Sequence, residues 1–256
     1  MKCRFIDTSK NDAYLNMAID EALLLCSKEP VLRVYQWSPS SVSVGYSQSV
    51  SQEINVSECR KNNVDIVRRI TGGKAVFHDD ELTYSFIVPK NTIRLPNGVA
   101  ESYRVIASAL LLAFHEIGVK AEMKNVPEKI AFPSCFSSSN WYEIFAGGKK
   151  ICGSAQKRVD EKILQHGSML IDFDYEKNKL FFKQANSEIL RKKVTCIKNE
   201  LKKNISYNRL AKSLRRGFEK IFNIRFINDS LSDREMSEAY LLRKEKYSQD
   251  KWNFRI

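Results

Sequence analysis

The 256-residue chain has 43% hydrophobic residues and only six prolines, which excludes a largely disordered protein and favours a globular unit with a sizeable core. No apolar run approaches the roughly 20 residues needed to span a bilayer, and the N-terminal residues lack a secretory signal, so we expect a cytoplasmic protein with no membrane partner. Its 42 basic and 30 acidic residues give a formal charge of +12, which favours an anionic partner.

Cysteine and histidine usage argues against disulfides and metal. The six cysteines are too sparse for a disulfide scaffold, and none forms a C-x-x-C pair. The three histidines form no His-x-x-x-His or Cys-His cluster, so we expect no metal site. Most of the cysteines are interpreted as small buried hydrophobic residues.

The N-terminal part predicts a helix followed by strands. Asp12 is a suitable N-cap for a helix that ends near residue 28, and apolar residues recur within it at three- and four-residue spacing. Residues 31–37 and 42–46 predict two strands of a hairpin, because the intervening SPSS suits a turn. Tyr46, at the end of this hairpin, is expected in the core.

The central part alternates strands, one long helix and a loop. A strand over residues 64–69 precedes a second apolar strand over 82–88, rich in β-formers, which we expect to pair in the same sheet. The remaining expectations are a short helix over 57–62, a helix over 102–117, an irregular loop over 125–140, a hairpin closed by Gly147 and Gly148, and a strand over 163–172.

Past residue 174 the sequence becomes helical and basic. Leu210, Leu214 and Phe218 form a helical apolar stripe, and Ser232 with Glu235 forms a capping box for a last helix. We therefore expect one catalytic domain over residues 1–256, in which a smaller helical region at about 175–256 packs on an α/β body.

The most informative stretch is residues 68–78, RRITGGKAVFH, between the strands over 64–69 and 82–88. Gly72 and Gly73 can adopt backbone angles that other residues avoid and allow a ligand to approach the main chain, so this loop is a candidate ligand cradle. A Gly-Gly pair is also common in plain hairpin turns, and paired arginines are common on solvated surfaces.

This stretch resembles the signature loop of the lipoate-protein ligase, octanoyltransferase and biotin ligase superfamily. Three later stretches match the family in order and spacing: PSCF at 133–136, GKKICGSAQ at 148–156 and LQHGS at 164–168. The likeness extends from NMAIDE at 16–21 to the residues around 246–253 and so covers nearly the whole chain. It implies an α/β (α+β) catalytic-domain fold with mixed, largely antiparallel sheets flanked by helices.

The resemblance implies a set of substrate-binding residues. Its signature loop, here with Gly72 and Gly73, holds the carboxyl end of a lipoyl, octanoyl or biotinyl group. Small residues after a strand suit close approach to the acyl carbonyl, and a basic group suits a phosphate of phosphopantetheine, a carrier protein or a nucleotide. The further candidates are Arg68, Arg69 and Lys74 for phosphate, Gly153, Ser154 and Ala155 for the carbonyl, His166 and Gly167 as a second wall, and His78, which orients the loop or contacts the carbonyl. For both histidines a purely structural role is an equal alternative.

Cys135 and Lys150 are the candidate catalytic residues. The resemblance places the acyl-accepting cysteine of octanoyltransferases and amidotransferases in a loop that matches the one around Cys135, although a buried inert thiol is the commoner fate of a cysteine. A free thiol is only about 3% thiolate at pH 7, and a nearby cation raises this fraction. Lys150 matches the lysine that the family directs at the reacting carbonyl. Because adjacent strand residues face opposite sides, Lys149 should then point to solvent.

Two departures from the ligases favour a transferase. Lys74 replaces the third glycine of the ligase signature, and DELT at 80–83 replaces its Gly-Asn segment. We therefore expect a cysteine-dependent octanoyltransferase without cofactor. It would take octanoyl from acyl carrier protein and pass it to a lysine of an apo lipoyl-accepting protein, such as the glycine cleavage H protein or a dehydrogenase lipoyl domain.

Three alternatives remain open at the level of sequence. An ATP- and Mg-dependent lipoate-protein ligase would tolerate loss of Cys135. A lipoyl or octanoyl amidotransferase would use the same cysteine with another lipoyl protein as donor. A basic nucleic-acid-binding module is disfavoured, because the Lys/Arg clusters lack interleaved aromatic residues and any nucleic-acid motif, so we expect no nucleic-acid partner.

Overall fold

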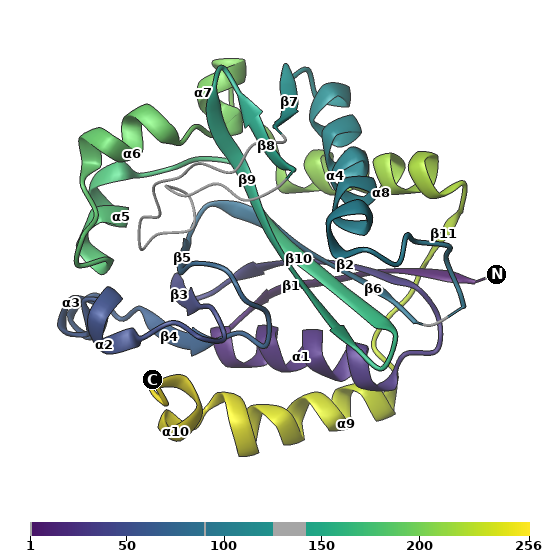
Figure 1. Cartoon of the computed structure of the whole chain (residues 1–256), viewed down its shortest axis with the longest axis horizontal. Helices are drawn as coiled ribbons and strands as arrows, with labels where there is room; N and C mark the ends of the chain where they lie inside the picture. Colours follow the sequence, from purple (N-terminus) through teal and green to yellow (C-terminus); the bar gives the residue numbers. More distant parts are fainter. Residues whose placement is uncertain (1, 90, 125–141) are drawn as a thin grey trace.

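The computed structural model describes residues 2–89, 91–124 and 142–256, which fold into two β-sheets flanked by helices (Figure 1). The large sheet has eight strands in the order β11-β1-β2-β6-β10-β9-β8-β7, and the small sheet has the order β4-β3-β5. Pairs β1/β11, β1/β2 and β3/β4 are parallel, whereas the other pairs are antiparallel. The strands are β1 (Cys3–Asn11), β2 (Val31–Trp37), β3 (Ser41–Val44), β4 (Asp65–Arg68), β5 (Val76–His78), β6 (Glu81–Val88), β7 (Ala121–Lys124), β8 (Glu143–Ala146), β9 (Lys149–Val159), β10 (Lys162–Leu170) and β11 (Phe226–Asn228).

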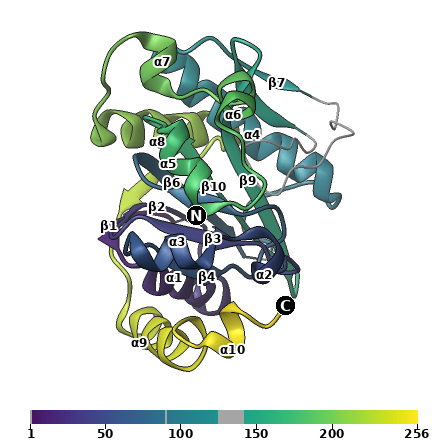
Figure 2. The ribbon, with the colours of Figure 1, turned by 90° about the vertical axis from the view of Figure 1, so that its left-hand side faces the viewer.

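Helices cover both faces of the large sheet. Figure 1 shows α1 and α9 on one side and α4 and α8 on the other, and Figure 2 shows the same layers edge-on. Within the described ranges, no helix is both long enough and apolar enough to cross a membrane. The helices are α1 (Ala13–Cys26), α2 (Val50–Glu53), α3 (Val56–Lys61), α4 (Val99–Glu116), α5 (Tyr175–Phe181), α6 (Ser187–Lys193), α7 (Ile197–Leu201), α8 (Tyr207–Phe222), α9 (Asp233–Leu242), a π-helical turn η2 (Arg243–Tyr247) and α10 (Asp250–Asn253).

The helices α1 and α9 begin at the N-cap residues that the sequence predicts. The Asp12 side chain accepts a hydrogen bond from the Leu15 amide at 2.8 Å and so satisfies an N-terminal donor of α1. Ser232 and Glu235 form the predicted capping box of α9. The predicted strand over 31–37 is confirmed with the same bounds, and the predicted hairpin around Gly147 and Gly148 joins β8 to β9.

Two apolar cores sandwich the large sheet. One core joins α4 and α8 to the sheet, and the apolar stripe of Leu210, Leu214 and Phe218 faces it. The two helices approach closely at Gly217, where a Cβ atom would lie 2.3 Å from the Ala109 carbonyl oxygen. The other core packs α1 and α9 on the opposite face. Because successive side chains of a strand point to opposite faces of the sheet, the same strands contribute residues to both cores.

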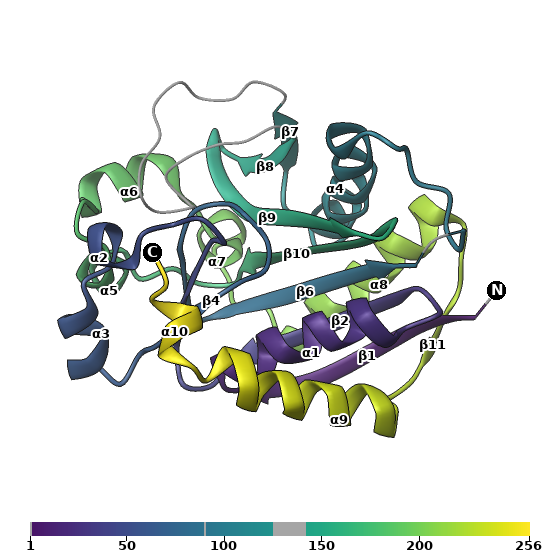
Figure 3. The ribbon, with the colours of Figure 1, turned by 60° about the horizontal axis from the view of Figure 1, so that its bottom comes forward.

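The C-terminal part contributes to the body along its whole length. The strand β11 extends the large sheet beside β1, α9 lies along α1, and α10 ends next to β4 (Figure 3). Trp252 Nε1 donates to the Arg68 carbonyl oxygen at 2.9 Å, and the Val50 amide donates to the Ile256 carbonyl oxygen at 3.2 Å. The last residues are thereby attached to the small sheet and to α2.

Two strand pairings differ from the sequence prediction. The expected hairpin of residues 31–37 and 42–46 does not form, because β2 belongs to the large sheet and β3 to the small one. The strand over 82–88 is β6 of the large sheet, whereas the strand over 64–69 is β4 of the small sheet. A short strand, β5, lies at the end of the signature loop and pairs with β3. Apolar periodicity identifies strands but not their partners, so these two predictions were wrong.

Candidate active site

A cavity lies where the small sheet faces the large sheet. Its empty volume is about 350 Å³, a figure that includes space open to solvent. The small sheet and signature loop contribute Arg69 and His78, and the large sheet contributes His166 and small residues of β9 and β10. The lining residues are Met17, Tyr35, Trp37, Ser43, Arg69, Val76, His78, Thr83, Gly153, Ser154, Ala155, His166, Gly167 and Ser168.

One wall combines an aromatic surface with polar anchors. The rings of Trp37 and His78 are stacked with centroids 3.9 Å apart and planes 12° apart. Trp37 Nε1 donates to Thr83 Oγ1 at 2.8 Å, and Thr83 in turn donates to Glu81 Oε1. Because these side chains are held by hydrogen bonds, the wall presents an ordered, mainly apolar surface.

The signature turn is shaped by Gly73 and held by Arg69. Gly73 has φ of +89°, a backbone conformation that favours glycine. A Cβ atom on Gly45 would lie 2.0 Å from the Gly73 carbonyl oxygen, so the two segments touch through their backbones. Arg69 Nη2 donates to the carbonyl oxygens of Gly72 at 2.9 Å and Lys74 at 3.1 Å. The turn is therefore fixed from inside by a buried guanidinium.

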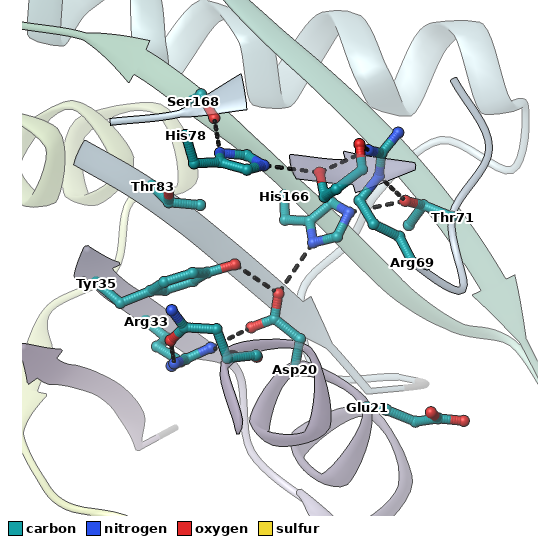
Figure 4. A network of polar contacts seen from close by, with 12 residues as sticks. Asp20, Glu21, Arg33, Tyr35, Arg69, Thr71, His78, Thr83, His166 and Ser168 are labelled. Atoms are coloured by element: carbon teal, nitrogen blue, oxygen red, sulfur yellow. Dashed lines mark hydrogen bonds and ion pairs between the residues drawn. The ribbon is translucent and has the colours of Figure 1, made fainter. Parts of the chain in front are cut away.

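His166 belongs to a buried polar group that includes Asp20, Arg33 and Tyr35 (Figure 4). Its Nδ1 lies 2.9 Å from Asp20 Oδ2, and its Nε2 lies 2.8 Å from Thr71 Oγ1. Burial lowers the pKa of His166, outweighing the opposing effect of Asp20. Burial alone would raise the pKa of Asp20, but the charge of Arg33 at 2.7 Å and the bond to His166 lower it overall.

His78 is held in a similar way by a carboxylate and a hydroxyl. Its Nδ1 lies 2.8 Å from Glu81 Oε1, and its Nε2 lies 2.7 Å from Ser43 Oγ. Ser168 adds a hydrogen bond to Glu81 Oε1 at 2.7 Å. Both histidines thus line the cavity while their ring nitrogens are occupied by protein groups.

The facing strands need small residues at this point. A Cβ atom on Gly167 would lie 2.4 Å from the Gly153 carbonyl oxygen and 2.4 Å from Ser154 Oγ. Ser154 Oγ is hydrogen-bonded to Tyr84 Oη at 2.8 Å. Gly153, Ser154, Ala155 and Gly167, all predicted from the sequence, therefore form the strand wall of the cavity together with His166.

Comparison with known proteins decides the family. The model of the lipoyl protein ligase A/B catalytic domain matches residues 12–219. The chain belongs to this family. Three similar relatives are named Octanoyltransferase LipM: those of Halalkalibacterium halodurans and Staphylococcus aureus at 38% identity and that of Bacillus subtilis at 36%, each alignment covering 98% of both chains. Like these relatives, the chain is an enzyme.

Solved structures of lipoate-protein ligases confirm the fold. Lipoate-protein ligase A bound with ATP has a TM-score of 0.86 and 26% identity, with 99% of each chain covered. A putative lipoate protein ligase from T. acidophilum with bound lipoic acid has a TM-score of 0.84 and 26% identity over the full length of both chains. The predicted α/β fold with largely antiparallel sheets is therefore confirmed, and so is the predicted superfamily.

Lys150 lies at the buried end of β9. Its side chain is 2% exposed, and its Nζ donates to Glu143 Oε1 at 2.7 Å, whereas Lys149 is partly exposed as expected. Lys150 is not among the described residues that line the cavity. At about 3.3 Å per residue it lies roughly 10 Å from Gly153 along the strand. Its role at a reacting carbonyl stays a prediction.

Arg68 has a structural position that the sequence did not reveal. The side chain is fully buried, with 0% exposure. Its guanidinium donates to the main-chain carbonyls of Gly45, Tyr46, Gln48, Trp252 and Asn253 at 2.8–3.1 Å. A guanidinium enclosed in this way has no exposed atom for a phosphate, so the geometry does not support the expected phosphate contact.

Lys74 and Tyr46 lie outside the cavity lining. Lys74 Nζ is 3.9 Å from Glu53 Oε1 and its side chain is 35% exposed, so its phosphate contact stays a prediction. Tyr46 is 39% exposed, and the Arg255 guanidinium lies 3.8 Å from its ring centroid. The expectation that Tyr46 packs in the core was wrong, because the C-terminal residues cover only part of its ring.

Cys135 lies outside the described residues. The five cysteines within them are Cys3, Cys26, Cys59, Cys152 and Cys196, and none of these lines the cavity. Cys152 directly precedes Gly153, which lines the cavity. Burial raises the pKa of the Cys152 thiol to about 12 despite the opposing effects of Ser154 and Lys150. Cys152 is therefore a thiol at neutral pH, and its sulfur is not activated as a nucleophile.

Several lining residues were not predicted. Ser43 and Thr83 are polar residues that alternate with apolar residues in β3 and β6, and Trp37 is the last residue of β2. Polar residues at alternate positions of a buried strand are the signal that could have identified them. In the part of the chain that the structure describes, no group of three or more His, Cys, Asp or Glu residues could hold a metal ion.

Proposed function

We propose that the protein is an octanoyltransferase of lipoate biosynthesis, which moves an octanoyl group from acyl carrier protein to a lysine of an apo lipoyl-accepting protein. The observation that carries this proposal is the identity of 36–38% with LipM octanoyltransferases over 98% of both chains. The cavity supports it, since an aromatic and apolar wall suits an acyl chain and the polar signature turn suits its carbonyl end.

In the proposed mechanism Cys135 accepts the acyl group. Its thiolate attacks the carbonyl carbon of the donor thioester, the bond to the carrier sulfur breaks, and the carrier leaves as a thiolate, which takes up a proton from solvent. The neutral amine of the acceptor lysine then attacks the cysteine thioester, forming an amide, losing a proton to solvent and releasing the Cys135 thiolate. The thioester donor is already activated, so neither step needs ATP, and ping-pong kinetics follow.

Lys150 is the proposed cation beside the nucleophile. Lys124 and Glu143, the strand residues on either side of the sequence segment that contains Cys135, are partners in the β7/β8 pairing. Glu143 contacts Lys150 directly. Cys135 precedes Glu143 by eight residues, which can span at most about 29 Å, so Lys150 is within its reach. An ammonium group there would favour the thiolate and stabilise a developing oxyanion.

The experiment measures octanoyl transfer from octanoyl-acyl carrier protein to an apo H protein without ATP. We expect activity for the wild-type enzyme and for Cys26→Ala, a control at a partly exposed cysteine outside the cavity. Cys135→Ala should lose activity by roughly a thousandfold or more. Full activity of Cys135→Ala would reject the covalent mechanism.

A lipoate-protein ligase is the second candidate, because lipoate-protein ligase A bound with ATP matches this chain with a TM-score of 0.86. A parallel assay with free lipoate, ATP and magnesium distinguishes the two. Activity only in that assay, retained in Cys135→Ala, would establish the ligase. Transfer from an octanoylated H protein instead of the carrier would indicate an amidotransferase.

A further inference from the structure

Two histidines are joined through Arg69 into one continuous buried hydrogen-bond chain (Figure 4). Arg69 Nη1 lies 2.7 Å from Ser43 Oγ, and Arg69 Nε lies 3.3 Å from Thr71 Oγ1. From these two hydroxyls the chain continues in opposite directions through the histidine rings, each to a carboxylate. The Arg69 network is defined here as Asp20, His166, Thr71, Arg69, Ser43, His78 and Glu81.

The direction of each hydrogen bond in the Arg69 network follows from its central residue. A guanidinium can only donate, so the Ser43 and Thr71 oxygens accept from Arg69. Each hydroxyl proton is then available to the facing Nε2 of His78 or His166. The Nδ1 proton of each ring is directed at a carboxylate oxygen, at 2.8 Å from Glu81 and 2.9 Å from Asp20. An Nδ1–H tautomer of each ring satisfies all of these hydrogen bonds.

Charge balance supports the same assignment. The two carboxylates, Asp20 and Glu81, face two guanidinium groups, those of Arg69 and of Arg33, which contacts Asp20 at 2.7 Å. Protonating either histidine would add a positive charge to this buried group and remove the Nε2 lone pair that can accept the hydroxyl proton. When each Nε2 accepts from its hydroxyl, neither ring has a free basic nitrogen for a substrate proton.

The Arg69 network connects the two sheets at the cavity. Its ends lie on α1, through Asp20, and on β6, through Glu81, whereas Ser43 lies on β3 of the small sheet. Its centre holds the signature turn through the Gly72 and Lys74 carbonyls. Any displacement of Arg69 would therefore move the turn relative to the strand wall formed by Ala155 and Gly167.

We propose that Ser43, Thr71, His78 and His166 are positioning residues, which fix Arg69 and the signature turn for acyl transfer, and that neither histidine acts as a general base. This inference rests on the proposed function for its kinetic part. In the transfer reaction the Arg69 network sets the geometry of the reacting carbonyl, so its loss lowers kcat more than it raises KM for the donor.

The kinetic test removes each hydroxyl separately. Ser43→Ala and Thr71→Val should each lower kcat by about tenfold to a hundredfold, whereas Thr71→Ser, which keeps the hydroxyl, should stay within about threefold of wild type. Ser85→Ala is the matched control, because Ser85 Oγ is also buried but has no hydrogen-bond partner among the described residues. Its kcat should be unchanged. Equal losses for Thr71→Val and Thr71→Ser would overturn the proposal.

The double variant tests whether both hydroxyls act through Arg69. Since they share this residue, the loss in Ser43→Ala/Thr71→Val should be smaller than the product of the single losses by about threefold or more. Strictly multiplicative losses would show two independent sites and contradict one network. The unfolding curve of each variant confirms that the compared enzymes are folded.

The tautomers are measured without any acyl donor. In ¹⁵N spectra of the free protein, His78 and His166 should each show a protonated Nδ1 and an unprotonated, hydrogen-bonded Nε2, and the Nε2 signal of His166 should move in Thr71→Val. Nε2–H tautomers in the wild type would overturn the network. Failure of the wild type to transfer octanoyl, with these signals present, would remove the proposed function and leave the tautomer assignment intact.

Discussion

Burial sets the protonation state of His166. The ring lies within the core beside Asp20, and desolvation lowers its pKa below the ordinary value of about 6.5. At pH values between the lowered pKa of His166 in the folded protein and its ordinary pKa in the unfolded chain, His166 binds a proton in the unfolded chain and not in the folded protein. The contribution of His166 to stability is therefore complete above about pH 6.5 and is lost as the pH falls below that value.

The pH dependence of the unfolding free energy tests this contribution of His166 to stability. Below pH 6.5, His166→Gln should reduce the slope of unfolding free energy against pH by at most about 1.4 kcal/mol per unit. His115→Gln is the control, since His115 bonds only the Ala121 carbonyl oxygen among the contacts described for it, at 2.7 Å. An unchanged slope in His166→Gln would show that His166 does not titrate in this way.

Residue types revealed part of the site. Gly73 was a candidate because of its residue type, and Gly153, Ala155, Gly167 and the cavity histidines were predicted from the resemblance of their motifs to the family. The adjacent arginines could not be told apart, since Arg69 lines the cavity and Arg68 binds carbonyls of segments far away in the sequence. Tertiary contacts, which a single sequence does not contain, decide between such neighbours.

At the scale of elements, Arg68 joins three segments. It links β4 to the loop after β3, through the Gly45 and Gln48 carbonyls, and to α10, through the Asn253 carbonyl. Asn253 Oδ1 accepts from the Arg68 amide at 2.9 Å in return. The C-terminal helix thereby supports the backbone that touches the signature turn at Gly73.

Hydrogen exchange tests this link. Arg68→Met removes the donors and leaves buried carbonyls unsatisfied, so unfolding free energy should fall by roughly 2–4 kcal/mol. Amides of residues 45–50 and 250–254 should exchange at least about tenfold faster. Arg191→Met, at an exposed pair with Glu176, should change neither quantity measurably. Unchanged protection of residues 250–254 in Arg68→Met would contradict the linking role.

The strands and helices were largely predictable, and their pairing was not. The Asp12 N-cap, the strand over residues 31–37 and the Ser232 capping box are local predictions that the structure confirms. The crossing from β2 to β3 between two sheets depends on which apolar faces meet in the folded core. The apolar pattern of a strand does not indicate the sheet to which the strand belongs, which explains why the hairpin of residues 31–46 was wrongly predicted.

At the scale of the whole molecule, charge should affect the encounter with the donor. The formal charge of +12 favours association with an acidic carrier protein, and salt screens such attraction. Between 50 and 500 mM salt, KM for octanoyl-acyl carrier protein should rise by roughly tenfold. KM for an octanoyl thioester of a small uncharged thiol should hardly change. Equal salt effects on both donors would show that the net charge does not steer the carrier.

The mass of the intact enzyme tests the central claim most directly. Purified protein is mixed with octanoyl-acyl carrier protein, without ATP and without acceptor, and weighed. The proposed mechanism predicts a mass increase of one octanoyl group in the wild type and in Cys26→Ala, which an apo H protein then removes, and no increase in Cys135→Ala. An adduct that persists in Cys135→Ala, or octanoylated H protein produced by that variant at the wild-type rate, would contradict it.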